Sequence, residues 1–184
     1  ESVGPVIGRE VAGRAVQAVG IAALGILGYV TYAFRGVKNS FRYGVCAIAA
    51  LLHDATIVIG LTAILGQYFD WEVDALFLTA LLTVIGFSVH DSIVVFDRIR
   101  ENLSRYRRAE YESVVNLSVV QTLDRSINTQ LTALFTLFAL ALFGGDSIFH
   151  FVVTMMIGLF SGTYSSLFNA APILVVWEKR EWRH

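Results

Sequence analysis

Long apolar segments alternate with short charged connections along the whole chain. A helix that spans a bilayer needs about 20 mostly apolar residues, and five segments meet this requirement: about 11–34, 41–69, 74–96, 124–143 and 149–177. The segments are continuous rather than alternating, and they are about twice as long as the strands of a membrane barrel. The sequence therefore predicts an all-α fold, a polytopic membrane bundle of five spanning helices that occupies residues 1–184.

The basic residues predict the orientation of the bundle. Eleven of the fourteen Lys and Arg residues follow the first, third and fifth spans: Arg35, Lys38, Arg42, Arg98, Arg100, Arg105, Arg107, Arg108, Lys179, Arg180 and Arg183. The other two connections contain acidic residues and no Lys or Arg: Asp70, Glu72, Asp74 and Asp146. Because cytoplasmic loops are rich in Lys and Arg, we expect a cytoplasmic C-terminus and residue 1 on the outer side.

Two further expectations concern segments outside the five spans. A start on the outer side without a signal peptide predicts that an upstream segment is missing from this sequence. Apolar residues recur at helical spacing over about 103–122, between charged residues, which predicts an amphipathic helix that lies at the membrane interface or packs on the base of the bundle.

Composition excludes several classes of function. The net charge is −1, so the chain has no basic field to attract a nucleic acid. Its one cysteine, Cys46, cannot form a disulfide framework. The sequence contains no nucleophile elbow and no phosphate-binding loop, so we expect that the protein is not an enzyme.

Ionisable residues within the spans are the candidate functional residues. Asp54 lies near the middle of the second span, Asp91 lies in the cytoplasmic half of the third, and Arg125 begins the fourth. A charged side chain at a helix centre costs roughly 2.5–3.5 kcal/mol, so these residues must face the bundle interior, pair or meet water. Desolvation favours the protonated form of a carboxylate and a nearby arginine favours the ionised form. We therefore interpret Asp91 and Arg125 as a proton-binding pair and Asp54 as a second station; a structural ion pair is the alternative.

Two His-Asp dipeptides, His53-Asp54 and His90-Asp91, superficially suggest a metal site. Adjacent residues of a helix point about 100° apart, and the sequence offers no further cluster of ligands, so we predict no metal.

In the last span Gly158 and Gly162 form a G-x-x-x-G pair, and Ser161 and Ser165 form a second pair of small residues at the same spacing. Such residues let helices approach closely, so we interpret them mainly as packing residues; a hydrated pathway is the alternative.

The third span carries a recognisable motif. The segment Gly86-Phe87-Ser88-Val89-His90-Asp91-Ser92-Ile93-Val94-Val95-Phe96-Asp97-Arg98 resembles the signature of the SecF family of bacterial protein-export membrane proteins. Three other segments also resemble the family: Val3-Gly4-Pro5, Asp124-Arg125-Ser126-Ile127-Asn128-Thr129, and Gly162-Thr163-Tyr164-Ser165-Ser166.

The resemblance implies a function and partners. It implies half of a resistance-nodulation-division-type membrane domain, preceded by a first span and a periplasmic domain. It implies a subunit in the bacterial inner membrane that works with SecD, separate or fused, beside the Sec channel, and that uses the proton-motive force and no cofactor to complete the translocation of exported preproteins. By motif, Asp91 and Arg125 correspond to family proton-pathway residues, and Asp54 has a weaker claim. The motif segments add His90, Ser88, Asn128, Thr129, Gly162 and Ser165 as supporting residues.

Two other functions remain open from the sequence. One is a proton-coupled exporter of small molecules or lipids from the same superfamily. The other is a structural subunit that braces a translocon without transporting protons, in which paired neutral replacement of Asp91 and Arg125 would be tolerated.

Overall fold

A computed structural model describes the backbone of residues 5–37, 39–69, 71 and 73–181, and the side-chain surroundings from residue 13 to residue 179 within these ranges. Seven helical segments occur there: α1 (Pro5–Ala33), α2 (Ser40–Phe69), α3 (Ala75–Arg105), α4 (Tyr111–Phe143), α5 (Asp146–Ser165), the π-helical η1 (Ser166–Ala170) and α6 (Ala171–Glu181). Residues of the sequence analysis that lie outside the described part are Glu1, Val3, Gly4, Lys38, Asp70, Glu72 and Arg183.

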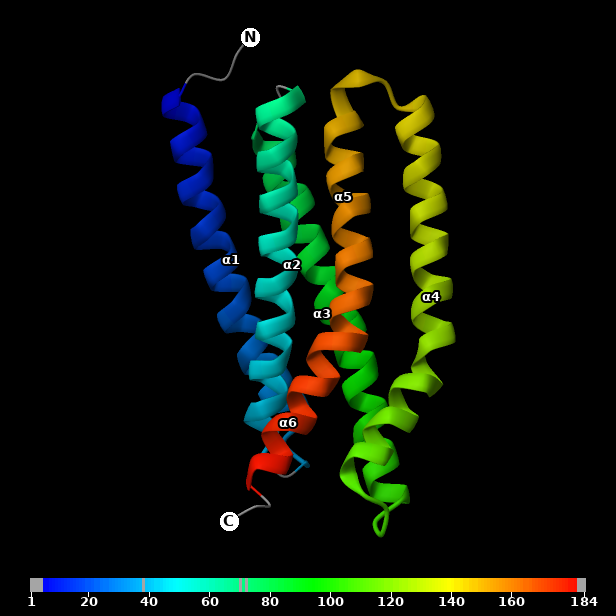
Figure 1. The fold of residues 1–184 in the computed structure, drawn as a ribbon. Helices are drawn as coiled ribbons and strands as arrows, with labels where there is room; N and C mark the ends of the chain where they lie inside the picture. Colours follow the sequence, from blue (N-terminus) through cyan, green and yellow to red (C-terminus); the bar gives the residue numbers. More distant parts are fainter. Residues whose placement is uncertain (1–4, 38, 70, 72, 182–184) are drawn as a thin grey trace.

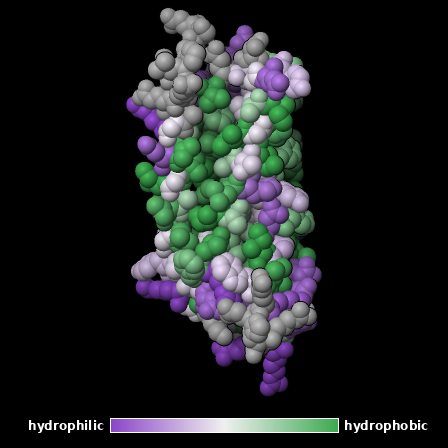
Figure 2. Space-filling view, turned by 60° about the vertical axis from the view of Figure 1, so that its left-hand side comes forward, coloured by the Kyte–Doolittle hydropathy of each residue, from purple (hydrophilic) through white to green (hydrophobic). Residues whose placement is uncertain are grey.

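The long helices run side by side as one bundle, with the N-terminus at one end and the C-terminus at the other (Figure 1). Within the described residues, five helical stretches are long and apolar enough to cross a membrane, the last of which runs from Asp146 through η1 to Lys179. In Figure 2 apolar side chains cover most of the middle of the visible face, and polar ones gather at its lower end. This surface is that of a protein whose helices face lipid.

Helix α3 is the central helix, and it is longer than the expected span of 74–96. Asp74 begins it by accepting a hydrogen bond from the Phe77 amide at 2.8 Å, which satisfies a backbone donor that a helix start leaves free. The helix continues beyond residue 96 because Ile99 and Asn102 remain buried on the same face as Phe96. Phe96 also meets the rings of Phe34 and Tyr43 edge-on, at centroid distances of 6.2 Å and 5.3 Å. These aromatic contacts join α1, α2 and α3.

The structure differs from the expected interfacial helix over about 103–122. Residues 103–105 end α3, a short turn follows, and Tyr111 begins α4, which continues without interruption to Phe143. Buried residues recur about every fourth position along one face of α4, from Val114 through Ser118, Thr122, Ser126 and Gln130. One continuous face is best buried by one continuous helix, and Figure 1 shows its first turns angled toward α3.

Helices α4 and α5 are joined by a tight turn at the end of the bundle where α1 begins. Gly145 adopts a φ of +80° there, a conformation that glycine adopts without steric cost. Near the opposite end, the regular hydrogen bonding of α5 changes to a π-helical turn over Ser166–Ala170, shortly before Pro172, which has no backbone N–H to donate. The chain then continues as α6 in a different direction (Figure 1).

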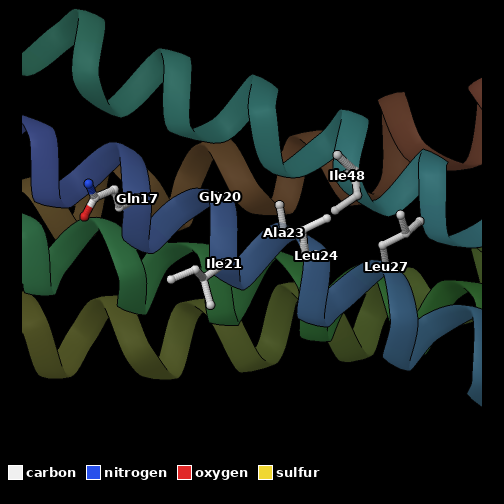
Figure 3. A pocket seen from close by; sticks show the side chains of 7 residues that line it. All are labelled: Gln17, Gly20, Ile21, Ala23, Leu24, Leu27 and Ile48. Atoms are coloured by element: carbon white, nitrogen blue, oxygen red, sulfur yellow. The ribbon is translucent and has the colours of Figure 1, made fainter.

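Helix α1 packs against only one side of the bundle. Its spanning stretch has few buried residues. A wide apolar groove runs along α1 and is lined by Gln17, Gly20, Ile21, Ala23, Leu24 and Leu27 of that helix and by Ile48 of α2. Figure 3 shows aliphatic side chains along this groove. The functional side chains therefore come from the more closely packed helices α2 to α5.

Candidate functional site

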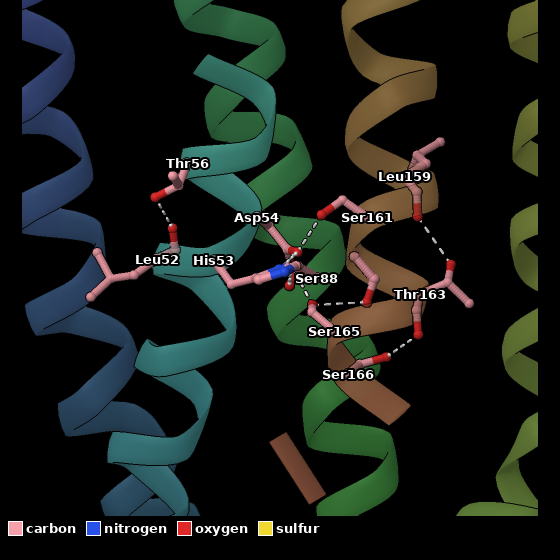
Figure 4. A network of polar contacts seen from close by, with 11 residues as sticks. Leu52, His53, Asp54, Thr56, Ser88, Leu159, Ser161, Thr163, Ser165 and Ser166 are labelled. Carbon is pink, nitrogen blue, oxygen red and sulfur yellow. Dashed lines mark hydrogen bonds and ion pairs between the residues drawn. The ribbon is translucent and has the colours of Figure 1, made fainter. Parts of the chain in front are cut away.

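A fully buried carboxylate lies in the middle of helix α2. The exposed fraction of Asp54 is 0%, and its two oxygens accept hydrogen bonds from three serine hydroxyls on two other helices. Ser161 donates to Oδ1 at 2.7 Å, Ser165 donates to Oδ2 at 2.6 Å, and Ser88 also donates to Oδ2. Figure 4 shows these side chains converging from α2, α3 and α5. We refer to Asp54, Ser88, Ser161 and Ser165 as the Asp54 cluster.

Helical spacing explains how the Asp54 cluster forms. Ser161 and Ser165 are four residues apart, so both hydroxyls lie on one face of α5. Gly162 lies beside them and lets α5 approach α3, since a Cβ at this position would be 3.3 Å from the Ser88 Cβ and 3.7 Å from Asp54 Oδ2. Gly162 is thus a packing residue that places two serines against a carboxylate.

His53 connects the Asp54 cluster to the surface of the bundle. Its Nδ1 lies 3.1 Å from Asp54 Oδ1, while 35% of its side chain is exposed. The imidazole ring also lies near the ring of Tyr164, at a centroid distance of 6.3 Å. One hydrogen bond thus links the buried Asp54 carboxylate to a histidine that is partly exposed at the surface of the bundle.

The chemistry of the Asp54 cluster is that of a carboxylate held by hydroxyl donors. An ionised carboxylate is stabilised away from water by hydroxyl donors. When the carboxyl group gains a proton it becomes a donor itself, so one of the surrounding groups must turn to accept. Protonation therefore changes the hydrogen bonds among three helices.

A second buried carboxylate lies on α3. Asp91 is 6% exposed, and its Oδ2 accepts a hydrogen bond from Gln130 Nε2 of α4 at 3.1 Å. Asp91 and Ser88 lie one turn apart on the same helix, but no hydrogen bond connects Asp91 to the Asp54 cluster among the described residues. The structure thus contains two separate buried carboxylate sites.

Arg125 does not pair with Asp91 in the described part of the chain. Its side chain is exposed and lines a cavity of about 410 Å³ that also borders Tyr29, Asp97 and Arg100. Arg125 precedes Gln130 by five residues, which is about 7.5 Å along a helix. The position opposite Asp91 is therefore taken by Gln130, and Arg125 lies further toward the end of the bundle that carries α6.

The other predicted supporting residues divide into two groups. Ser88, Gly162 and Ser165 belong to or border the Asp54 cluster. His90, Asn128 and Thr129 have exposed side chains on the surface of this bundle.

Three residues that contact the carboxylates are not among the candidate residues of the sequence analysis: His53, Ser161 and Gln130. His53 is adjacent to Asp54 in the chain, whereas Ser161 and Gln130 lie on other helices. A signal existed for both: Ser161 is one turn from Ser165, and Gln130 continues the face of α4 that carries Ser118, Thr122 and Ser126. No group of three or more His, Cys, Asp or Glu residues suited to a metal occurs among the described residues.

Comparison with known proteins identifies the family. The model of the protein export membrane protein SecD/SecF C-terminal region matches residues 1–180. The protein translocase subunit SecF of Anaerolinea thermophila is 62% identical over 185 residues, which cover 100% of this chain and 60% of that protein. The protein translocase subunit SecDF of Bacillus subtilis is 40% identical, over 98% of this chain and 24% of its own length.

A solved structure confirms the fold. A crystal structure of SecDF in the super-membrane-facing form matches with a TM-score of 0.82 and 39% identity, covering 91% of this chain and 22% of that one. The predicted all-helical bundle of five spanning helices is therefore confirmed. The chain spans about 60% of the length of its SecF relatives, which are protein translocase subunits. Because the family model covers almost the whole sequence, this multi-pass membrane chain belongs to the SecD/SecF family of protein-export membrane proteins and corresponds to its C-terminal membrane region.

Proposed function

We propose that this chain is the membrane part of a SecF subunit that couples proton flow through its bundle to the export of preproteins. The observation that carries the proposal is the Asp54 cluster, in which a fully buried carboxylate is held by hydroxyls from two other helices. The family membership supplies the export function, since the relatives are protein translocase subunits.

Protonation of Asp54 supplies the coupling step. In the ionised state the carboxylate accepts hydrogen bonds from α3 and α5 together, which holds the three helices in one arrangement. The proton removes the negative charge and makes the carboxyl group a donor, so a serine hydroxyl or His53 Nδ1 must accept from it, which favours a different arrangement. A proton that crosses 100 mV supplies about 2.3 kcal/mol, which changes the ratio of two conformations about fiftyfold.

Asp91 and Arg125 form the second part of the proposed pathway. Asp91 exchanges its proton at the α3–α4 contact, where its Oδ2 accepts a hydrogen bond from Gln130 Nε2 at 3.1 Å. Arg125 moves between its present exposed position and a direct ion pair with Asp91 as the helices rearrange. This retains the predicted pairing as one state of a cycle.

The proposal also includes location and partners. The chain lies in the bacterial inner membrane with the end of the bundle that carries α6 on the cytoplasmic side, as the basic residues predict. SecD, separate or fused, supplies the other half of the membrane domain; the Bacillus subtilis relative is named SecDF. The Sec channel and the exported preproteins are the remaining partners, and a first span with a periplasmic domain precedes residue 1.

Isosteric replacement of the carboxylates in the full-length subunit tests the proposal. Asp54→Asn keeps the size of the side chain, replaces one acceptor oxygen with an NH2 donor, and cannot bind or release a proton. We expect proton-driven export by vesicles that contain the complete translocase to fall at least tenfold, while export without a proton gradient stays unchanged. Asp91→Asn is expected to have the same effect.

The matched control is Glu101→Gln. Glu101 also lies on α3, but it is exposed and paired with Arg98 at 2.6 Å, so proton-driven export is expected to stay within twofold of the wild type. Normal proton-driven export by Asp54→Asn would show that Asp54 is a structural residue and would overturn the proposed coupling step.

A further inference from the structure

A small polar cavity opens near the end of the bundle where α3 begins. It measures about 40 Å³ and is lined by Thr62 of α2, Thr154 and His150 of α5, and Trp71 and Asp74 of the connection before α3, among others. We refer to it as the Thr62 cavity. At its edge His150 stacks on Trp71 with a centroid distance of 4.3 Å.

A buried hydroxyl in this cavity has no partner among the residues that the structure describes. Thr62 is 3% exposed, and its Oγ1 makes no hydrogen bond to any of these residues. Buried polar atoms are nearly always bonded to protein or to ordered water, and a cavity needs only about 10–15 Å³ of accessible space to hold one water. The Thr62 cavity therefore has both the room and an unsatisfied group for water.

The Thr62 cavity lies directly above the Asp54 cluster. Thr62, Val58 and Asp54 follow one another at four-residue intervals on α2, so they share a face. Thr154 and Ser161 likewise lie on the face of α5 that turns toward α2 and α3. Eight residues separate Thr62 from Asp54, which is about 12 Å along a helix.

Apolar side chains separate the cavity from the cluster. Val58 is 0% exposed, and Val84 and Leu159 are each 1% exposed. Gly158 lies against Val84 so closely that an added Cβ would be 2.2 Å from Val84 Cγ2. One layer of packed apolar groups, about a helical turn thick, thus lies between two polar sites.

We propose that the Thr62 cavity is a water-filled vestibule by which protons from the outer side approach Asp54, closed in this conformation at Val58 and Val84. The inference rests on the proposed function for its direction, since it names the outer entrance of the same pathway. The ligand is water. Opening requires α3 and α5 to separate at the Val84–Gly158 contact, and the rearrangement of the Asp54 cluster acts on these same two helices.

Accessibility to a small thiol-reactive ion tests the vestibule. In the full-length subunit, with Cys46 and any other native cysteine replaced, single cysteines are placed by Thr62→Cys, Thr154→Cys and Val58→Cys. Sealed vesicles are exposed to silver ions on the outer side only, and the remaining free thiols are counted with a maleimide after denaturation. Silver ions are hydrated, similar in size to water, and do not cross lipid.

We expect the rate of reaction with silver to fall from the Thr62 cavity toward the Asp54 cluster. Cysteines at positions 62 and 154 are expected to react at least fivefold faster than the cysteine at position 58, and only from the outer side. Positions 62 and 154 both line the cavity. If one of these two cysteine variants does not accumulate in the membrane, the other still tests the vestibule. Lack of reaction at both 62 and 154 would overturn the vestibule, and equal reaction at 58 would overturn the apolar closure.

A second measurement tests the role of the cavity in proton movement. Thr62→Val keeps the shape of the side chain and removes the hydroxyl that holds water, so proton-driven export is expected to slow at least threefold. The control is Thr56→Val, since Thr56 lies on the same helix but is exposed and donates to the Leu52 carbonyl. Equal export by the two variants would contradict a role in proton entry.

Failure of this inference and failure of the proposed function give different results. Silver reaction at 62 and 154 together with normal proton-driven export by Asp54→Asn would contradict the coupling step and leave the water cavity. Lack of silver reaction at 62 and 154, together with slow proton-driven export by Asp54→Asn, would support the coupling step and overturn the vestibule.

Discussion

The contact between Gly158 and Val84 makes a sharp prediction about the stability of the bundle. A Cβ at position 158 would lie 2.2 Å from Val84 Cγ2, 2.6 Å from Cγ1 and 2.9 Å from Cβ. Carbon atoms pack at about 3.5–4.0 Å, and rotation of the valine side chain cannot move its Cβ. Gly158→Ala therefore forces α3 and α5 apart by about 1 Å, and overpacking of this kind costs about 1–3 kcal/mol.

The measurement compares Gly158→Ala with Gly86→Ala in the full-length protein. An added Cβ at Gly86 meets no atom within 4 Å, and both substitutions gain the same helix propensity, about 1 kcal/mol. The difference between their free energies of unfolding, from denaturant titration in detergent, therefore isolates the steric clash.

A double-mutant cycle completes the test. Val84→Ala removes the two nearest carbons, so it is expected to recover about 1 kcal/mol or more of the loss caused by Gly158→Ala. Equal stability of Gly158→Ala and Gly86→Ala would show that α3 and α5 are not held at this distance, and the reasoning about close packing would fail.

Two further predictions concern polar contacts at the other end of the bundle. Asn102→Ala removes two hydrogen bonds of 2.8 Å to α4 and is expected to lower the free energy of unfolding by about 1–3 kcal/mol; a change below 0.5 kcal/mol would contradict it. The pair of Arg42 and Glu178 is nearly buried, with side chains 8% and 14% exposed, whereas the pair of Lys179 and Glu112 is 52% and 55% exposed. Glu178→Gln is therefore expected to destabilise the protein more than Glu112→Gln in thermal unfolding, and only the smaller effect of Glu112→Gln is expected to disappear in high salt.

The fold followed largely from the sequence because a membrane imposes one simple rule. Each apolar segment longer than about 20 residues must be a helix, since backbone groups have no other partner in lipid. The first four predicted spans accordingly match α1 to α4 or parts of them to within one residue, and the fifth runs from α5 through η1 into α6. The boundaries of α3 and α4 were less predictable, because their buried faces continue beyond the apolar core along Ile99, Asn102, Val114 and Ser118.

The sequence predicts the two carboxylates of the site but not all of the residues that form hydrogen bonds with them. Asp54 and Asp91 were selected because charge in a span is costly, and both are buried. Ser161 and Gln130 contact them, but they come from helices that lie 107 and 39 residues further along the chain. Helical spacing shows which residues share a face and does not show which face of another helix lies opposite.

The sequence by itself therefore determined the number of spans, their expected orientation and the presence of buried ionisable groups. Only the tertiary structure decided that Asp54 receives the serine hydroxyls, that Gln130 rather than Arg125 contacts Asp91, and that Thr62 faces a cavity. The physical reason is that lipid acts on each helix separately through its hydropathy, whereas hydrogen bonds and cavities depend on the rotation and distance of several helices at once.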